Sequence, residues 1–419
     1  MPKRSRQDVA RRRIAYKCIC GLSASLGVQT VTFQPSDSCV NQDRVVAEKW
    51  DIQGDRWLFL AVCDGHFGTV TAEYTAKTLP TQLRRSLRSL LQHDLQKKLD
   101  RTNINQYQSE ITVLLKREIE AFDEAIGGAL QSICPKPEQL TEEEARRLIE
   151  DHGDVVSRAF EGTTLALALI NVDQRFMWAA GVGDSTVGLS TLGRDGKRRS
   201  EKLCEVHTFK NPQEYYRAVM AHSHQEQPLL DWEDRILGWL SVPRAIGDFA
   251  LKLPSSYLTN LFRYTSYAGR QDILKYAPKI VTPPYIISEP SVRFTDLDPV
   301  WGVENKILLF TDGVDNLVDG YIVFTPGQHS GVDPIDVVSS LLGDEVDPKT
   351  EETLGHPVEP MWSREENNKP LDILGNLLGG TDIQRLEMVT NEARLRDTGE
   401  GWPFHVDDTS IIVWGLSAS

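Results

Sequence analysis

The sequence has no long apolar run, no regularly spaced set of cysteines and no excess of positive charge. Its longest apolar stretches are about ten residues, half of what a membrane-spanning helix needs, and no apolar segment follows the basic start to form a secretory signal. The 6 cysteines are scattered, which favours a reducing, intracellular compartment. Asp and Glu number 60 against 46 Lys and Arg, and the net charge of −14 makes nucleic acid an unexpected partner.

Several signatures of phosphate and metal chemistry are absent as well. No cysteine is followed by an arginine in a C-x5-R pattern, which excludes phosphatases that use a cysteine nucleophile. There is no G-x-x-x-x-G-K-[ST] loop and no G-x-G-x-x-G segment opening a helix. The GDxHG and GNHE motifs of another large metallophosphatase class are missing, as is the HExxH motif of zinc proteases. These absences exclude nucleotide-driven and zinc-protease activities.

What is present is an alternation of strand-like and helix-like stretches in a chain of 419 residues. Apolar residues at steps of three and four predict a helix over 107–133, and Thr141 with Glu144 predicts a capped helix over 141–152. Another helix is expected over 70–98, kinked or broken at Pro80. Since these helices lie between two hairpins, we expect one large domain with helices outside the sheets.

Composition indicates insertions within this domain. Those near 190–235 and 344–370 are polar and expected on the surface, and the one near 254–285 is aromatic. Residues 1–20 are expected to be a basic tail, which is compatible with a nuclear signal, an organellar presequence or a solvated segment. Little room precedes residue 21 for a removable presequence, so a cytoplasmic or nuclear location is favoured over the mitochondrial matrix.

The first hairpin predicts a pair of facing carboxylates. Residues 43–50 and 57–63 are rich in β-branched and aromatic residues and flank a turn at 51–56. Folding the chain about that turn puts Asp43 opposite Asp64 at the open end. Two carboxylates facing each other repel unless a cation lies between them. The register therefore predicts a metal site.

Later strands end in acids too. A second hairpin folded about Asp173 would bring Asp184 beside Gly162. The strand 306–310 runs into Asp312, and Asp407-Asp408 opens the last strand, 409–414, so antiparallel pairing would bring these acids to one edge. One Asp-Gly after a strand is usually a turn, but several strand ends converging in acids indicate a site.

The acids form an oxygen-rich candidate metal set: Asp43, Asp64, Asp184, Asp312, Asp407 and Asp408. Such ligands suit Mg²⁺ or Mn²⁺ better than zinc. Two such ions could lower the pKa of a water molecule and direct it at a phosphorus atom. His66, two residues after Asp64, would then be the natural proton donor to a departing alkoxide, although a lone histidine after Asp-Gly is more often a plain turn residue.

At this point the sequence resembles the PP2C-type (PPM) metal-dependent serine/threonine phosphatases. Any one of the matching blocks is a weak signal, but together they occur in the family's order and imply a single phosphatase domain over residues 21–416. They are 41-NQDR-44, 61-AVCDGHFG-68, 162-GTTLALALI-170, 179-AAGVGDS-185, 240-LSVPRAIGDF-249, 308-LLFTDG-313 and 407-DDTSIIV-413. Within the family the sequence is most similar to the pyruvate dehydrogenase phosphatases, through 234-DRILGWLSVPRAIGD-248, 281-VTPPYIISEPSV-292 and the paired Asp407-Asp408.

The resemblance implies an α+β fold, in which a central β-sandwich of two antiparallel sheets is flanked by helices on both faces. It also implies a dimetal site at one end of the sandwich. Asp64 would bridge two ions, the carbonyl of Gly65 would bind one, and Asp312 and Asp407 the other. Asp43 would join through bound water.

Further roles are implied by the same motifs. Asp184, with Asp312, would hold a weaker third ion. A hydroxide bridging the two ions would attack the phosphorus, and His66 would be the general acid that protonates the leaving oxygen. Arg244 and Asp248 match a motif that we interpret as an ion pair supporting the fold.

The sequence departs from the family pattern at three positions. Gln42 stands where many relatives have Glu, Ser38 where animal-type relatives have a phosphate-gripping Arg, and Asn316 where an acid is usual. Arg44 and Asp315 are the candidates to compensate. Arg44 is at least as compatible with a solvated charge at a strand start.

Two functions therefore stay open. One is a monomeric Mg²⁺- or Mn²⁺-dependent phosphatase acting on phosphoserine or phosphothreonine, with a pyruvate dehydrogenase-like or another metabolic or signalling phosphoprotein as substrate. The alternative is a pseudophosphatase that serves as a binding scaffold. The core carboxylates together with His66 favour the enzyme.

Overall fold

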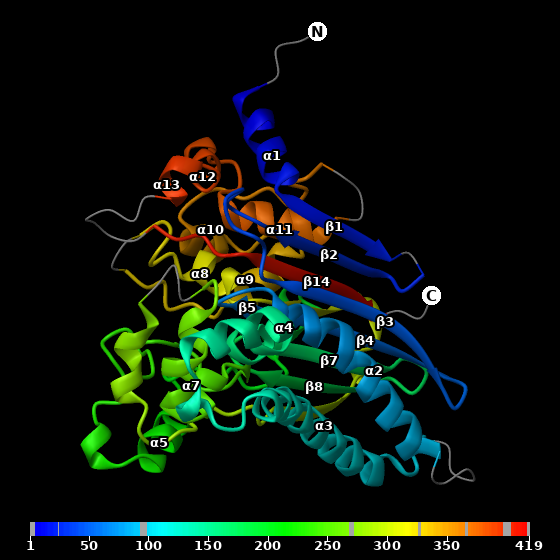
Figure 1. The fold of residues 1–419 in the computed structure, drawn as a ribbon. Coiled ribbons are helices and arrows are strands. Elements are labelled where there is room, and N and C mark those ends of the chain that lie inside the picture. The colour runs from blue at the N-terminus through cyan, green and yellow to red at the C-terminus, as the bar shows by residue number, and fades with distance from the viewer. Residues whose placement is uncertain are drawn as a thin grey trace.

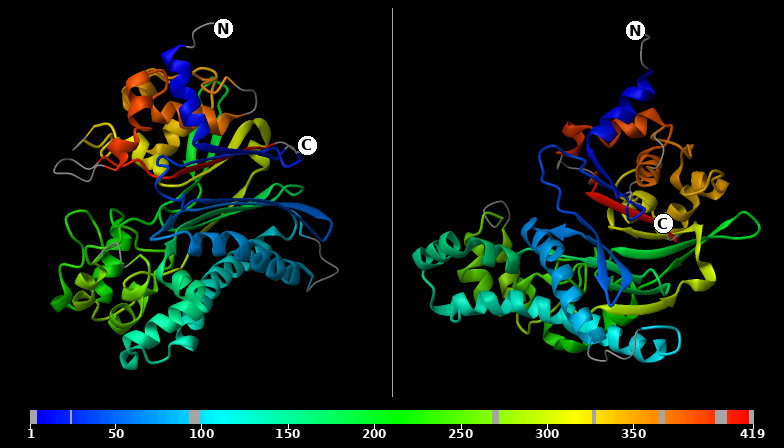
Figure 2. Two further views of the ribbon diagram at one scale, coloured as in Figure 1. Left: turned by 45° about the horizontal axis from the view of Figure 1, so that its top comes forward. Right: turned by 90° about the vertical axis from the view of Figure 1, so that its right-hand side faces the viewer.

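The structure is a computed structural model that describes residues 5–23, 25–92, 99–267, 272–325, 328–364, 368–396 and 404–416. Two antiparallel sheets lie face to face at its centre (Figures 1 and 2). One sheet has the order β1-β2-β14-β13-β9-β10, and the other β12-β8-β7-β4-β3. A small third sheet, β11-β6-β5, lies beside them. The predicted α+β sandwich is confirmed.

The strands of the larger sheet are β1 (Cys18–Ser23), β2 (Val28–Phe33), β14 (Thr409–Leu416), β13 (Gly302–Phe310), β9 (Thr186–Leu192) and β10 (Arg198–Lys202). Those of the five-stranded sheet are β12 (Ser291–Asp296), β8 (Phe176–Val182), β7 (Leu165–Asn171), β4 (Asp55–Cys63) and β3 (Arg44–Ile52). The small sheet consists of β11 (Ile246–Gly247), β6 (Gly162–Thr163) and β5 (Gly65–His66).

Alternation along the central strands explains the layers. In β4, Leu58 and Leu60 face the core between the two sheets, whereas Trp57 and Phe59 pack against the helices on the outer face. A strand buried on both faces reads as a continuous apolar run, as β4, β7 and β8 do. This double burial fixes the register and hence the ends of the strands, where the acids lie.

Helices cover both outer faces (Figure 2). The five-stranded sheet packs against α2 (Val70–Gln92), α3 (Ile104–Ile133) and α4 (Glu142–Phe160). The six-stranded sheet is covered by α1 (Arg6–Tyr16), α8 (Gly313–Asp319), α9 (Pro334–Leu341) and α11 (Lys369–Leu378), with α10 (Pro348–Leu354), α12 (Ile383–Met388) and α13 (Glu392–Leu395) further out. Helices α5 (Pro212–Ala221), α6 (Phe249–Lys252) and α7 (Ser255–Asn260) belong to the segment between β10 and β12. Short 3₁₀ turns occupy 137–139, 224–226, 262–264, 273–279 and 298–300.

The helix predictions hold with altered ends. The capping box of Thr141 and Glu144 is present, and α4 continues beyond 152 to Phe160. Pro80 lies inside α2. The end of the predicted helix 70–98, at 93–98, lies outside the described residues. So do residues 1–4 of the basic segment, 268–271 of the insertion near 254–285 and 365–367 of the insertion near 344–370. Among the described residues, no helix is both long and apolar enough to cross a membrane.

Two segments differ from expectation. The basic start is no solvated tail over its described part, because α1 buries Ile14 and Arg11, and Arg11 donates to the carbonyl of Trp362 at 2.9 Å. The stretch 344–370, expected on the surface, contributes Leu354 and Trp362 to the core. In both cases a few apolar residues within a charged segment are buried, which average composition does not reveal.

Candidate metal centre

The first hairpin places its two acids as predicted. Strand β3 pairs with β4 in the register Arg44↔Cys63, so Asp43 and Asp64 flank the open end of the pair. Asp43 is buried, with 3% of its surface exposed, and Asp64 is half-buried. The Asp43 N–H donates to Asn41 Oδ1 at 2.8 Å, and Thr311 donates its hydroxyl to Asp43 Oδ2 at 2.9 Å. Thr311 comes from the other sheet, so it ties the two sheets together at this edge.

The last two strands bring their acids to the same edge, also as predicted. Strand β13 pairs with β14 in the register Phe310↔Ile411, and the Thr311 N–H donates to the carbonyl of Ser410. Asp312 therefore follows one strand where Asp408 precedes the other. The Gln42 N–H donates to Asp408 Oδ2 at 2.8 Å, which joins this pair to the first hairpin.

The second hairpin has a different register from the predicted one. Strand β7 pairs with β8 as Leu165↔Val182, one residue away from the register that set Asp184 beside Gly162. The reason is the turn, which is centred between residues 173 and 174 and includes Arg175 at a positive φ of 62°. Asp184 still reaches the acids, because its carboxyl interacts electrostatically with Asp315.

The acids perturb one another strongly. Burial, and then the neighbouring Asp408, raises the pKa of Asp43 well above its ordinary value. Burial, and then Asp312, does the same to the pKa of Asp64. The other raised pKa values have burial as their largest cause and an acidic neighbour as a further one: Asp312 well above its ordinary value, Asp184 and Asp408 to about 7, and Asp315 to about 8. Predicted acids from both sheets thus form one electrostatic group, which a cation would relieve.

The donor atoms fit a hard divalent cation. Asp43 Oδ1 and Asp315 Oδ2 are buried without a hydrogen-bond partner, which is costly for a carboxylate unless it binds a cation. The neighbouring Asp312 raises the pKa of Asp64, as does Asp43, after the larger effect of burial. Within the described part of the chain, no three acidic, histidine or cysteine side chains are grouped so that they could together hold a metal ion as they stand. The residue types and the unpartnered oxygens match Mg²⁺ or Mn²⁺.

Gln42 lies against the backbone that was expected to bind an ion. In the orientation that its neighbours favour, its amide nitrogen donates to the Gly65 carbonyl at 3.2 Å and its oxygen accepts from the Gly68 N–H at 3.0 Å. A carbonyl oxygen has a second lone pair, so Gly65 can still bind a cation. A Cβ on Gly65 would lie 2.7 Å from the backbone carbonyl oxygen of Gln42, which explains why position 65 is a glycine.

His66 has a partner that the sequence did not reveal. Its Nε2 lies 2.7 Å from Asp248 Oδ2. The predicted ion pair between Arg244 and Asp248 is therefore wrong: Arg244 instead pairs with Glu214 at 2.5 Å, and both of those side chains are largely buried. Glu161 also interacts electrostatically with His66, and burial raises the pKa of Glu161 to about 7.

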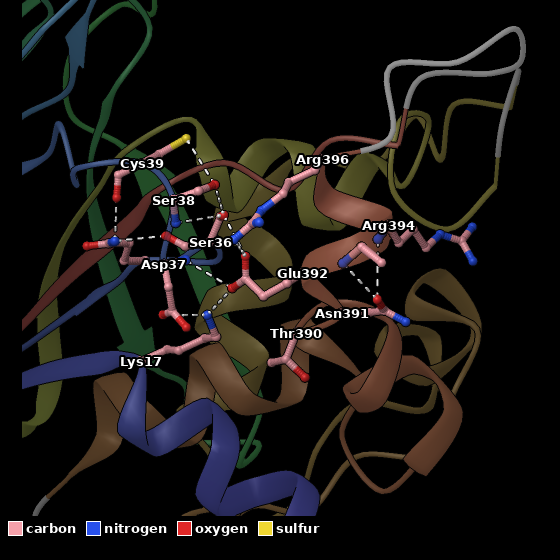
Figure 3. A network of polar contacts seen from close by, with 12 residues as sticks. Lys17, Ser36, Asp37, Ser38, Cys39, Thr390, Asn391, Glu392, Arg394 and Arg396 are labelled. Carbon is pink, nitrogen blue, oxygen red and sulfur yellow. Dashed lines mark hydrogen bonds and ion pairs between the residues drawn. The ribbon is translucent and has the colours of Figure 1, made fainter.

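The two candidates for phosphate recognition have other partners. Ser38 shares a hydrogen bond with Ser36 at 2.7 Å in a loop before Asp43 (Figure 3). Arg44 is bound to Glu73 and to two backbone carbonyls. A basic group near the acids that sequence reasoning missed is His405, whose pKa is raised by its hydrogen bond to Asp407. Its position two residues before Asp407 was the available signal.

Comparisons with known proteins identify the family. Residues 29–319 match the family Protein phosphatase 2C. The chain is similar to pyruvate dehydrogenase (acetyl-transferring) phosphatase 1, mitochondrial, of Bos taurus, with 29% identity over 162 residues, which are 38% of this chain and 29% of the relative. It is 26% identical to "Probable protein phosphatase 2C 40" of Arabidopsis thaliana over 67% of this chain and 52% of that protein. The chain thus spans less than two thirds of either relative.

A solved structure is also similar. The crystal structure of serine-threonine phosphatase 2C from Toxoplasma gondii aligns with a TM-score of 0.49 and 14% identity, covering 95% of this chain and 99% of that one. The family match itself extends from β2 to the end of α8 and includes both hairpins and Asp312. This chain belongs to the protein phosphatase 2C family.

Proposed function

We propose that this chain is a Mg²⁺- or Mn²⁺-dependent protein serine/threonine phosphatase. The observation that carries the proposal is the group of acids that comes together from both sheets, in which burial, and then Asp312 and Asp43, raises the pKa of Asp64 well above its ordinary value. Carboxylates held close together repel one another and destabilise the fold, so their presence indicates a functional site. Family membership supports a phosphate monoester as that use.

The proposed ligands are the acids predicted from the sequence. Asp64, the Gly65 carbonyl, Asp312 and Asp407 would hold two ions, with Asp43 acting through water. Asp408 would support these ligands indirectly, because its Oδ2 accepts a hydrogen bond from the Gln42 N–H at 2.8 Å.

A third, more weakly bound ion would have Asp184 and Asp312 as its proposed ligands. Asp315 lies in the same electrostatic group and has a buried oxygen without a hydrogen-bond partner. It can therefore supply the carboxylate that many relatives have at the position of Asn316.

The chain's own residues would do the rest. When bound, the ions would neutralise phosphate charge and activate an attacking water. His66 lies one residue from Gly65 and is half-buried, so it can reach both a substrate and a partner inside the protein. We assign it the proton donation to the leaving serine or threonine oxygen.

The substrate is proposed as a phosphoprotein. The pyruvate dehydrogenase phosphatases among the relatives make a pyruvate dehydrogenase-like phosphoprotein the first to test, and their mitochondrial location makes the matrix a compartment to test beside the cytoplasm and nucleus. A panel of phosphoproteins incubated with the chain would rank these substrates.

One observation favours the alternative of a binding scaffold. Arg44 is held by Glu73, and Ser38 has no charge, so neither is free to grip a phosphate. A scaffold would bind phosphoprotein or metal without turnover. The retained His66 and its buried partner Asp248 favour the enzyme.

The deciding experiment measures hydrolysis of p-nitrophenyl phosphate and of a phosphothreonine peptide with Mn²⁺, with Mg²⁺ and with EDTA. We expect turnover of both substrates with either ion and none with EDTA. Mn²⁺-dependent thermal stabilisation without turnover would favour the scaffold. Activity that survives EDTA would overturn the metal-dependent mechanism.

A further inference from the structure

The small three-stranded sheet places Asp248 beside His66. Strand β6 is its middle strand and pairs with both neighbours, through His66↔Gly162 on one side and Gly247↔Gly162 on the other. Residues 66 and 247 thus lie on either side of Gly162, and Asp248 follows directly. The two side chains meet over that glycine, with His66 Nε2 2.7 Å from Asp248 Oδ2.

Gly162 is what leaves room for this contact. A Cβ built on it would collide with both Asp248 Oδ2 and His66 Nε2, the two atoms that form the hydrogen bond. The glycine has no positive φ that would require it on conformational grounds. Its lack of a side chain is therefore explained by the pair above it.

Backbone hydrogen bonds and a buried ion pair hold Asp248 in place. It adopts a left-handed conformation with φ 53°, and its N–H donates to the Glu161 carbonyl. The preceding Gly247 N–H donates to Asp123 Oδ1 at 2.8 Å, and Lys252 binds Asp123 Oδ2 at 2.7 Å. Both side chains of the Lys252–Asp123 pair are buried. A carboxylate in such a frame has little freedom to turn away from the histidine.

The contact leaves only one nitrogen of His66 available. Asp248 is 2% exposed, and its Oδ1 is buried without a partner, so its hydrogen-bonding capacity is directed at His66 alone. Among the described residues, His66 Nδ1 has no hydrogen-bond partner. The outer torsion of a histidine ring is broad, and a ring without a partner can flip. A buried carboxylate on one nitrogen selects one orientation and presents the other nitrogen outward.

We propose that Asp248 is a positioning residue that orients His66 for proton donation through Nδ1. This role rests on the proposed phosphatase function. It assigns Asp248 to the reacting site through His66, in place of the purely structural ion pair expected from its motif. Gly162 contributes to this positioning, because the His66–Asp248 pair packs against it.

The test is a double-mutant cycle on two substrates. We expect Asp248→Ala to lower kcat on a phosphothreonine peptide by about 10- to 100-fold, the usual cost of removing a group that orients a functional histidine. The loss on p-nitrophenyl phosphate should be smaller, because a phenolate needs less protonation. Asp248→Asn, whose amide oxygen can still accept the hydrogen bond, should recover much of the activity.

The cycle separates positioning from general support of the fold. In a His66→Ala background, Asp248→Ala should cost less than about 2-fold more, since it acts through a ring that is no longer there. Gly162→Ala should reproduce the substrate pattern of Asp248→Ala. The matched control is Asp234→Ala, an exposed aspartate at φ 58° in the same segment, which should leave both activities unchanged.

Two results would overturn the role. One is a loss from Asp248→Ala that multiplies with that of His66→Ala, and the other is an equal loss on both substrates. If Asp248→Ala lowers the thermal unfolding midpoint too far for assay, Gly162→Ala in the wild-type and His66→Ala backgrounds gives the same comparison. A wild-type chain without metal-dependent turnover overturns the proposed function and this role together, whereas active wild type with additive losses overturns this role alone.

Discussion

Replacing Glu392 with glutamine removes the charge at the centre of a polar network before the candidate site (Figure 3). Glu392, the first residue of α13, accepts from Lys17 Nζ at 2.7 Å, from the Ser36 hydroxyl at 2.9 Å and from the Asp37 N–H at 2.9 Å. The Lys17 side chain is only 6% exposed, so the carboxylate balances a buried charge. The network joins the segment after α1 and the C-terminal helices to the loop that leads to Asp43.

The size of the effect follows from the pKa. The hydrogen bond from Lys17 is the largest cause that lowers the pKa of Glu392, from 4.5 to about 2, with further lowering by the Asp37 N–H and the Ser36 hydroxyl and opposition from burial. At about 1.4 kcal/mol per pKa unit, this shift corresponds to at most about 3.5 kcal/mol. The side chain is 29% exposed, so solvent screening reduces the estimate to about 1–2 kcal/mol.

The assay is urea unfolding of wild type and Glu392→Gln at several pH values. Because the folded pKa lies below the unfolded one, the charge stabilises the fold fully above about pH 4.5, and this contribution is lost as the pH falls toward 2. The unfolding free energies of the two proteins should therefore differ at pH 7, and this difference should shrink as the pH falls from about 4.5 toward 2. The control is Glu387→Gln on α12, whose partner Arg6 is 73% exposed, and it should change the unfolding free energy much less. A difference that is the same at pH 7 and pH 3 would refute the electrostatic explanation.

Other substitutions test the site and the core. Asp312→Asn should abolish p-nitrophenyl phosphate turnover and the Mn²⁺-induced rise in unfolding temperature, yet raise that temperature in EDTA because one of the mutually repelling carboxyls is gone; a fall in EDTA would contradict this. Gln42→Glu should tighten Mn²⁺ binding by roughly tenfold in calorimetry, since it adds a carboxylate and removes the amide donor to the Gly65 carbonyl; unchanged affinity would place Gln42 outside the ligand set. Gly375→Ala in α11 should lower the unfolding free energy by about 1–3 kcal/mol, because its Cβ would collide with the buried Trp362 ring. Gly128→Ala in α3, where a Cβ meets nothing within 4 Å, should instead raise it by up to about 1 kcal/mol, and equal effects at both glycines would contradict the packing argument.

Local geometry explains which parts of the site could be predicted from the sequence. The register of β3 and β4 depends on a short turn and on strands buried on both faces, so counting from the turn placed Asp43 and Asp64 correctly. The antiparallel pairing of β13 and β14 brought Asp312 to the Asp408 end in the same way. In these cases neighbours in space are set by neighbours in sequence or by a single strand pairing.

Predictions failed where a backbone detail or a distant partner decides. The turn of the second hairpin includes Arg175 at positive φ, and this moved the register by one residue. The charged α1 segment buries Arg11 only because the Trp362 carbonyl and Glu359, far along the chain, receive its guanidinium. No periodicity in the first 20 residues contains that information.

The segment from Arg244 to Asp248 shows the same limit at the site itself. Side chains four residues apart face each other on a helix, but this segment runs through a bridge to Ile287, the short strand β11 and a left-handed residue, so the two side chains diverge. Arg244 then meets Glu214 of α5, and Asp248 meets His66. Each contact depends on strand pairings formed after long excursions of the chain. One motif thus connects α5 to the histidine proposed as general acid, so its residues bear on the chemistry as well as on the fold.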